Sequence, residues 1–209
     1  MQKIKNIILD YGNVIFMIDF ARVQESFSRL GIKNIDAFFG HRTQDALFDQ
    51  FDRGEFTASE FRTRVREIIG DSSLTDEAID DAWNSLLIGV PPGRHGMLEY
   101  LHDKYRTFLL SNNNEIHYAH CMKHIQEIYD VPSNEQFFEK TYYSHLIGIR
   151  KPDQAIFQLL IDENDIIPQQ TLFIDDSPQH LESARLLGFQ TALCTHEEPL
   201  EILIEKFGL

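Results

Sequence analysis

The chain has 209 residues, of which 43% are hydrophobic and 25% charged, and its formal net charge is −14. This length suits one globular domain, with room for an inserted subdomain. The negative charge argues against a nucleic-acid partner, because phosphate backbones are bound by surfaces rich in Lys and Arg. It also repels anionic substrates at long range, so an enzyme for phosphate esters would need a lysine or a metal ion at its site.

The first residues, "MQKIKNIILDYGN", do not have the pattern of a secretory signal peptide. Their apolar part is short, is interrupted by Lys5 and Asn6, and ends at Asp10. No apolar stretch is long enough to cross a bilayer. Cys121 and Cys194 form no CxxC pair, which favours reduced thiols. We therefore expect a cytoplasmic protein with no membrane partner, either a monomer or a homodimer.

The first predicted element is a buried strand, "KNIILD" at 5–10, which is apolar, rich in β-branched residues and too short for a helix. A helical pattern then continues to about residue 88. Thr57 and Glu60 have the spacing of a capping box, and Thr75 is a predicted N-cap. "PPG" at 91–93 breaks the pattern. The predicted helices of this block cover 20–30, 42–51, 57–69 and 75–89.

From residue 94 onward, predicted helices alternate with predicted strands. Such alternation indicates a parallel sheet with crossover helices. The predicted strands cover 106–111, 140–144, 170–176 and 189–194, and the helices cover 94–104, 115–128, 151–163, 177–188 and the C-terminal end. The predicted fold is therefore α/β: a Rossmann-like core of residues 1–16 and 92–209, with a helical cap subdomain, 17–91, inserted after the first strand.

Polar residues follow successive predicted strands. Asp10 ends the first strand, Ser111 ends the second, and Asp175 and Asp176 end the fourth. Lys151 lies in the "GIRKPD" loop before the next helix. Open parallel sheets bind ligands at the carboxyl ends of their strands. These five side chains are therefore expected to converge.

The chemistry of this set is that of phosphoryl transfer. Three clustered carboxylates repel one another unless a cation lies among them, and hard oxygen ligands suit Mg²⁺. A lysine and a serine hydroxyl bind phosphate oxygens, and a carboxylate nucleophile forms an aspartyl-phosphate that water hydrolyses. Taken singly, each residue also fits a structural role, as a turn former, a helix cap or a solvated side chain. The prediction rests on their shared edge.

The segments "DYGNV", "LLSNNN", "RKPD" and "FIDDS" resemble, in order, the four motifs of the haloacid dehalogenase-like (HAD) hydrolase superfamily. The position of the predicted cap between the first two motifs is also similar. Within the superfamily the chain looks most like the bacterial α-glucose-1-phosphate phosphatase branch. It shares the D-x-G-N-V-I start, an I-D-F at 18–20 and an R-G-E at 53–55. The resemblance implies a small phosphorylated metabolite, such as a hexose 1-phosphate, as substrate.

The resemblance also implies a Mg²⁺ cofactor. Asp10 would be the nucleophile and a metal ligand, and the Gly12 backbone carbonyl would be a second ligand. Asp176 would bind the metal directly, and Asp175 would contact one of the metal's ligands or reach the metal through a water molecule.

The phosphoryl group would be held by Ser111, by the Asn112 backbone and by Lys151. Gly12 and Asn13, in the turn after the nucleophile, would also bind it. Asp10, Lys151 and Ser111 are the predicted catalytic residues. Arg53 of the cap is a candidate for binding a sugar hydroxyl or a second anion. It is also placed to pair with Asp52 or Glu55 on the surface.

Two residues depart from the superfamily pattern. Most of its phosphatases have an aspartate where Gly12 stands, and that aspartate donates and accepts protons, which contributes roughly 10²–10⁴-fold in rate. We therefore hypothesise that esters with a good leaving group, such as sugar 1-phosphates, are favoured. His180 stands where an asparagine or aspartate often follows the acidic pair.

Two other functions fit parts of the same pattern. Dehalogenases of the superfamily also lack the second aspartate, but they need no metal and tend to lack the acidic pair. The alternatives are thus a haloacid dehalogenase-type hydrolase and a catalytically weak phosphate-binding protein. Asp10, Lys151, Asp175 and Asp176 together favour the phosphatase.

Substrate choice is expected to lie in the cap, which would close over the leaving group. The segments 16–20 and 88–93 are its predicted hinge strands. The candidate lining residues are Phe16, Met17, Phe20, Phe48 and Arg53. A separate cluster, His117, His120, Cys121 and His124, has helical spacing suited to zinc or to ordinary partly buried histidines.

Overall fold

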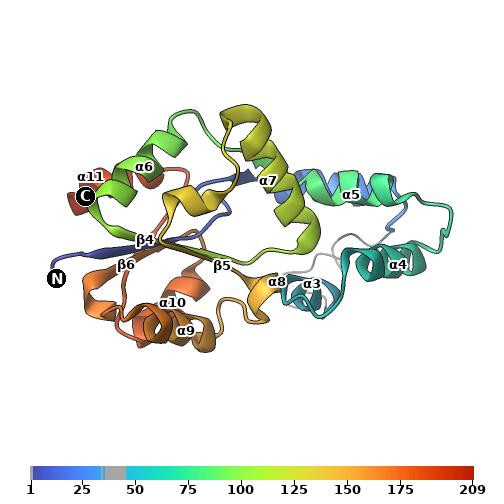
Figure 1. Ribbon diagram of the computed structural model, residues 1–209. Helices are drawn as coiled ribbons and strands as arrows, with labels where there is room; N and C mark the ends of the chain where they lie inside the picture. Colours follow the sequence, from blue (N-terminus) through green and yellow to red (C-terminus); the bar gives the residue numbers. More distant parts are fainter. Residues whose placement is uncertain (1, 34, 36–45) are drawn as a thin grey trace.

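The computed structural model describes residues 2–33, 35 and 46–209. Its centre is a parallel sheet (Figure 1). The order of the strands in this sheet is β5-β4-β1-β6-β7. The strands are β1 (Asn6–Leu9), β4 (Arg106–Ser111), β5 (Lys140–Tyr143), β6 (Thr171–Asp175) and β7 (Gln190–Leu193). β1 is central, and the chain first builds outward through β4 and β5 before returning to β6 on its other side. This reversal of direction places a topological switch point at β1.

Helices cover both faces of the sheet, as the predicted α/β fold requires. α6 (Arg94–Lys104), α7 (Glu115–Tyr129) and α11 (Leu200–Phe207) pack on one face, and α9 (Gln154–Asn164) and α10 (Pro178–Leu186) on the other (Figure 1). Successive side chains of β1 alternate between the two layers: Ile7 and Leu9 join the first hydrophobic cluster and Ile8 joins the second. Because both faces are covered, every residue of β1 is buried.

The residues between β1 and α6 form a helical unit beside the sheet. Its helices are α1 (Phe20–Arg29), α3 (Ala46–Asp52), α4 (Ala58–Ile69) and α5 (Asp76–Asn84). They bury a hydrophobic cluster of their own, which includes Phe27, Phe51, Phe61 and Trp83. Thr57 and Glu60 form the predicted capping box of α4, and Thr75 caps α5. We propose that this unit is the cap, with the boundaries predicted from the sequence.

The predicted helix over 75–89 is wrong at its end. α5 stops at Asn84, and Leu87–Gly89 form strand β3, which pairs antiparallel with β2 (Met17–Ile18). A short apolar run such as "LLIG" suits either a helix or a strand, and only the facing segment at 17–18 decides between them. The two strands connect the helical unit to the sheet at the predicted hinge segments.

The remaining predicted elements occur with small shifts at their ends. Residues 42–45 of the predicted helix over 42–51 lie outside the described residues, and α3 covers the rest. The helix predicted over 151–163 begins at Gln154, after Pro152. The structure adds three short elements: η1 (Asn134–Phe137), α8 (Ser144–Ile147) and η2 (Pro168–Gln170). Within the described ranges, no helix is both long and apolar enough to cross a membrane.

Candidate active site

The predicted site residues meet at the carboxyl end of the sheet. Asp10 follows β1, Ser111 is the last residue of β4, and Asp175 is the last residue of β6. Because β1 pairs in parallel with β4 on one side and β6 on the other, these three strand ends are direct neighbours. The main-chain N–H of Asp10 donates to the carbonyl of Ile174 at 2.9 Å, which fixes the start of the loop after β1.

Lys151 connects these strand ends. Its side chain is fully buried, and its Nζ donates to Asp10 Oδ1 at 2.6 Å, to Asp175 Oδ2 at 2.7 Å and to the Leu110 carbonyl at 2.7 Å. An ammonium group has three hydrogens, and all three are used. The two carboxylates keep this buried lysine charged and raise its pKa, although burial acts in the opposite direction.

The acidic groups outnumber this single ammonium. Carboxylate oxygens of Asp10, Asp175 and Asp176 lie within 4.8 Å of one another. Burial and the neighbouring Asp175 and Asp176 carboxylates raise the pKa of Asp10 against the influence of Lys151, and burial likewise raises the pKa of Asp176. A divalent cation among the carboxylates would supply the missing positive charge. The donor set, three carboxylates at one point, therefore fits a hard cation such as Mg²⁺.

Asp175 is the most firmly held of the three carboxylates. Besides Lys151, its Oδ1 accepts a hydrogen bond from the Ser177 main-chain N–H at 2.8 Å and one from His180 Nδ1 at 2.9 Å. Burial acts to raise the pKa of Asp175, but Lys151 and His180 outweigh it and lower that pKa to about 2. Ser177 stands at the N-cap of α10 as predicted, although its side chain makes no capping bond.

Asn13 has a role that the sequence did not reveal. Its Nδ2 donates to Asp176 Oδ2 at 2.8 Å, and its Oδ1 accepts from the Ile18 main-chain N–H at 3.2 Å. Its φ of 54° is in the left-handed region, where asparagine is enriched. Asn13 thus connects the turn after β1 to the acidic pair and to β2. The enrichment of asparagine in this conformation was the available signal.

Gly12 presents no side chain to the site, so the acid that most superfamily phosphatases place there is absent. Its backbone does not require glycine: no positive φ occurs at this position, and a Cβ would meet Ile18 Cδ1 at 3.4 Å. The backbone at this position could therefore carry an aspartate, and the acid is absent only because the sequence has glycine there. The predicted metal contact of the Gly12 carbonyl stays a prediction.

Ser111 and Asn112 lie on the other side of Lys151. Ser111 is 2% exposed, and its hydroxyl makes only a long contact of 3.5 Å with the Asn112 carbonyl. The Asn112 side chain makes two bonds of 2.9 Å with the Lys151 backbone, donating to its carbonyl and accepting from its N–H. The family resemblance implied a role only for the Asn112 backbone. Its side chain holds the loop that carries the lysine.

A row of ion pairs and hydrogen bonds, which we call the seam, joins the helical unit to the core beside this site. Arg150 Nη1 lies 2.7 Å from Asp49 Oδ1, and its Nη2 lies 3.5 Å from Asp52 Oδ2, both carboxylates belonging to α3. Arg53 pairs with Asp49 at 3.0 Å and with Asp153 at 3.7 Å. The expected pairing of Arg53 with Asp52 or Glu55 is therefore replaced by these two partners. No sequence pattern indicated the role of Arg150.

Asn114 and Glu115 complete the seam from the core side. The Asn114 Oδ1 accepts from Trp83 Nε1 at 3.2 Å, and its Nδ2 donates to Asp52 Oδ1 at 3.2 Å. The Glu115 carboxylate accepts from the Ala58 main-chain N–H at 2.7 Å, at the amino end of α4. Both residues follow the predicted phosphate-binding residues closely, so the helical unit contacts the same loop that would hold the substrate.

The histidine cluster on α7 does not form a metal site in the described part of the chain. Among the described residues, the side chains that are close enough together to hold a metal ion are the three aspartates. His117 is buried; its ring stacks on Trp83 at 4.6 Å, and its Nε2 bonds the Trp83 carbonyl at 3.0 Å. Burial lowers the pKa of His117 to about 4. His124 packs edge-on against Phe16, and Cys121 lies in the hydrophobic core.

The predicted lining residues have different surroundings. Phe16 is buried in the core, so the expectation that it lines a cavity is wrong. Phe20 is largely exposed at the start of α1. Met17 is partly buried in β2. Phe48 stacks on Trp83 at 4.9 Å inside the helical unit. Whether these side chains are buried or exposed depends on how each hydrophobic cluster packs, and no local sequence pattern predicts that packing.

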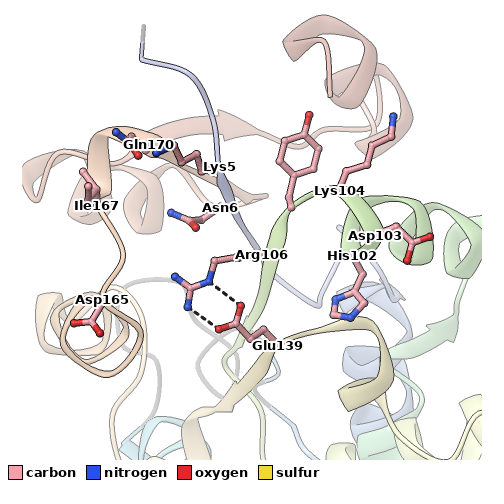
Figure 2. A pocket seen from close by; sticks show the side chains of 11 residues that line it. Lys5, Asn6, His102, Asp103, Lys104, Arg106, Glu139, Asp165, Ile167 and Gln170 are labelled. Carbon is pink, nitrogen blue, oxygen red and sulfur yellow. Dashed lines mark hydrogen bonds and ion pairs between the residues drawn. The ribbon is translucent and has the colours of Figure 1, made fainter.

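A separate cavity of about 640 Å³ lies at the opposite end of the sheet (Figure 2). It is lined by residues at the amino ends of β1 and β4, including Asn6 and Arg106, and by His102 of α6. A two-bond ion pair between Arg106 and Glu139 crosses it. Because ligands of open parallel sheets bind at the carboxyl edge, this cavity is distinct from the candidate active site.

Comparison with known proteins identifies the family. Residues 4–188 match the haloacid dehalogenase-like hydrolases. A curated relative, the D-ribitol-5-phosphate phosphatase of Bacteroides thetaiotaomicron, is 30% identical over 90% of both chains. A solved HAD family enzyme of the same organism, in complex with magnesium and inorganic phosphate, superposes with a TM-score of 0.85 at 35% identity, covering 96% of this chain and 98% of that one. A predicted HAD-like hydrolase of Porphyromonas gingivalis has a TM-score of 0.88 at 29% identity over 98% of both. These matches confirm the predicted fold and the predicted enzyme class, and the chain belongs to the haloacid dehalogenase-like hydrolase family.

Proposed function

We propose that this hydrolase is a Mg²⁺-dependent phosphomonoesterase that acts on a small sugar or polyol phosphate through an aspartyl-phosphate on Asp10. The observation that carries the proposal is the contact of Lys151 Nζ with both Asp10 and Asp175, beside Asp176. A dehalogenase needs no cation, whereas this cluster has more negative charge than its lysine neutralises. The magnesium and phosphate bound by a relative support the same reading.

Asp10 is suited to be the nucleophile. Its Oδ1 is engaged by Lys151, which orients the carboxylate at the sheet edge and leaves Oδ2 for attack on phosphorus. A bond forms between this oxygen and phosphorus, and the bond to the leaving-group oxygen breaks. Water then cleaves the acyl phosphate and regenerates Asp10. Bound Mg²⁺, held by Asp10 and Asp176 with the Gly12 carbonyl, would neutralise phosphoryl charge.

The Ser111–Asn112 turn would hold the phosphoryl oxygens, and Lys151, whose three hydrogens are already used, would attract them by its charge. Lys151 is anchored at its backbone by Asn112 and at its ammonium by two carboxylates, so its position is set before substrate binds. Preorganised charge of this kind stabilises a transition state without reorganisation during the reaction. Arg53, although paired with Asp49 and Asp153, remains our candidate for contacting the substrate from the cap.

Two classes of phosphate ester are candidate substrates. The absence of an acid at Gly12 favours a hexose 1-phosphate, whose hemiacetal oxygen leaves more easily than an ordinary alkoxide. The curated relative instead acts, by its name, on ribitol 5-phosphate, a primary alkyl ester. For such an ester the leaving-group proton must come from another source, such as water or the substrate. We rank the 1-phosphate first on leaving-group grounds.

The test is phosphate release from glucose 1-phosphate, glucose 6-phosphate and ribitol 5-phosphate, with and without Mg²⁺. Asp10→Asn is expected to lose at least roughly 10³-fold in kcat, because the nucleophile is removed. Asp103→Asn, a matched change at the opposite cavity, is expected to keep full activity. Release that survives Asp10→Asn would contradict the mechanism. Turnover of 2-haloacids without metal, and of no ester, would assign the chain to dehalogenation instead.

A further inference from the structure

His180 occupies a position that the proposed reaction does not yet use. It lies in the first turn of α10, and its side chain is 17% exposed. Its Nδ1 lies 2.9 Å from Asp175 Oδ1 and 3.1 Å from Asp175 Oδ2, so it faces both oxygens of the same carboxylate. Since a carboxylate only accepts hydrogen bonds, Nδ1 must carry the proton. The structure thus requires the Nδ1–H tautomer, or the doubly protonated ring.

This contact completes a set of donors around Asp175. Its Oδ1 accepts from the Ser177 N–H and from His180, and its Oδ2 accepts from Lys151. The side chain is fully buried, so water is not available to replace a missing donor. Two of these donors come from the amino end of α10, Ser177 as its N-cap and His180 in its first turn, and one comes from the loop before α9. The carboxylate is therefore oriented from two sides and can rotate only if one of the contacts breaks.

The orientation of Asp175 reaches the nucleophile through one further contact. Asp175 Oδ2 and Asp10 Oδ1 share the ammonium of Lys151, at 2.7 and 2.6 Å. A rotation of Asp175 would withdraw one of the two carboxylates that hold Lys151. It would also change the spacing of the three carboxylates that meet within 4.8 Å. Groups that orient metal ligands from behind typically change affinity or activity by roughly 10–100-fold when removed.

We propose that His180 is a positioning residue that orients Asp175 and, through it, Lys151 and the divalent-cation site. The expected effect of His180 on turnover rests on the proposed function, whereas its expected effect on cation binding does not depend on turnover. Asparagine can substitute for it, because Nδ2 of asparagine is separated from Cα by the same number of bonds as Nδ1 of histidine. A leucine fills a similar volume and donates nothing.

The first measurement is the protonation of His180 in the metal-free protein. ¹⁵N NMR of the imidazole, assigned with His180→Asn, is expected to show a protonated Nδ1 at neutral pH. Free imidazole side chains favour the other tautomer, so the result reports the contact with Asp175. An unprotonated Nδ1 overturns the proposal.

The second measurement is Mg²⁺ binding by isothermal titration calorimetry. His180→Leu is expected to raise the Kd for Mg²⁺ by about 10-fold or more, and His180→Asn to stay within about 3-fold of the wild type. His102→Leu is the control, because His102 also bonds through Nδ1, to Thr107 Oγ1 at 3.0 Å, but is exposed and lies beside the opposite cavity (Figure 2). Equal Kd values for His180→Leu and His102→Leu overturn the proposal.

The third measurement separates positioning from proton donation. At saturating Mg²⁺, His180→Leu is expected to lower kcat equally for an aryl phosphate and an alkyl phosphate, with rescue by His180→Asn. A loss confined to the alkyl ester would make His180 a proton donor to the leaving group and would overturn the positioning role. If the wild type releases no phosphate from any ester, the proposed function fails, while the NMR and calorimetry still decide the role of His180.

Discussion

Arg150 and Lys151 are consecutive and almost completely buried, yet they serve different regions. Lys151 directs its ammonium to the sheet edge, where it contacts Asp10 and Asp175. Arg150 directs its guanidinium to the helical unit, where it contacts Asp49 and Asp52 of α3. The two residues lie at the start of a turn, in which the Asp153 N–H donates to the Arg150 carbonyl at 3.0 Å, and their side chains diverge there. One loop therefore carries both the central cation of the candidate site and the central cation of the seam.

The partners of the two cations differ in exposure. The Asp10 and Asp175 side chains are 10% and 0% exposed, whereas those of Asp49 and Asp52 are 35% and 18% exposed. A carboxylate that keeps contact with water tolerates loss of its partner, while a buried one does not. Removal of Lys151 is thus expected to cost more free energy of unfolding than removal of Arg150, although the two sets of ion pairs look similar. The reason is desolvation and not distance.

The largest expected effect is that of Lys151→Met. Removing the ammonium leaves two buried carboxylates facing each other, and breaking a buried pair in this way costs about 3–5 kcal/mol. Urea denaturation without Mg²⁺ measures the loss, and added Mg²⁺ is expected to recover part of it. A loss below about 1 kcal/mol would show that the carboxylates are neutral without the lysine.

His117 stacks on Trp83 and lies 3.3 Å from Asn114 of the seam, so we expect it to make the seam sensitive to acid. Its folded pKa is about 4 against 6.5 for the free side chain. Between these values the unfolded chain binds a proton that the folded chain does not. The contribution of His117 to the free energy of unfolding is therefore fully present above pH 6.5. It falls by about 1.4 kcal/mol per pH unit toward pH 4, which is about 3 kcal/mol in all.

Measuring the free energy of unfolding from pH 7 to pH 4.5, for the wild type and for His117→Phe, isolates this contribution. Phenylalanine can stack on Trp83 but does not titrate. The difference between the two proteins should shrink as the pH falls. A difference that does not change with pH would mean that another group governs the acid sensitivity of the seam.

Arg150→Met tests the comparison directly. Its partner Asp49 is partly hydrated and also paired with Arg53, so the expected loss lies between exposed and buried pairs, roughly 1–2 kcal/mol. The same denaturation experiment measures it beside Lys151→Met. A larger loss for Arg150→Met than for Lys151→Met would reverse the ranking that burial predicts.

The smallest expected effect is local to the helical unit. Thr57→Ala removes the capping box of α4 and is expected to cost about 1 kcal/mol. Ser59→Ala, an exposed change two residues further along the same helix, is the matched control and should change stability by less than about 0.5 kcal/mol. Equal effects of the two variants would mean that the cap adds nothing to stability.

Much of the candidate site was predictable from local patterns. Short apolar runs ending in Asp10, Ser111 and Asp175 indicate strands whose carboxyl ends carry polar groups, and a parallel sheet brings such ends together. The same reasoning does not reach Asn13 and Asn112, because their side chains bond partners 163 and 39 positions away. Arg150 was missed for the same reason: a surface-type residue in a loop has no local signature of burial.

The sequence by itself determined the strand–helix alternation, the insertion of a helical unit after the first strand, and the identity of the acidic and basic groups at the strand ends. These follow from periodicity and spacing, which are local properties. Only the tertiary structure decided that β1 lies between β4 and β6, that "LLIG" pairs as a strand, that Asn13 holds Asp176, and that Arg150 and Lys151 point to different regions. These depend on which distant segments desolvate one another, and that information is not present in any single stretch of the chain.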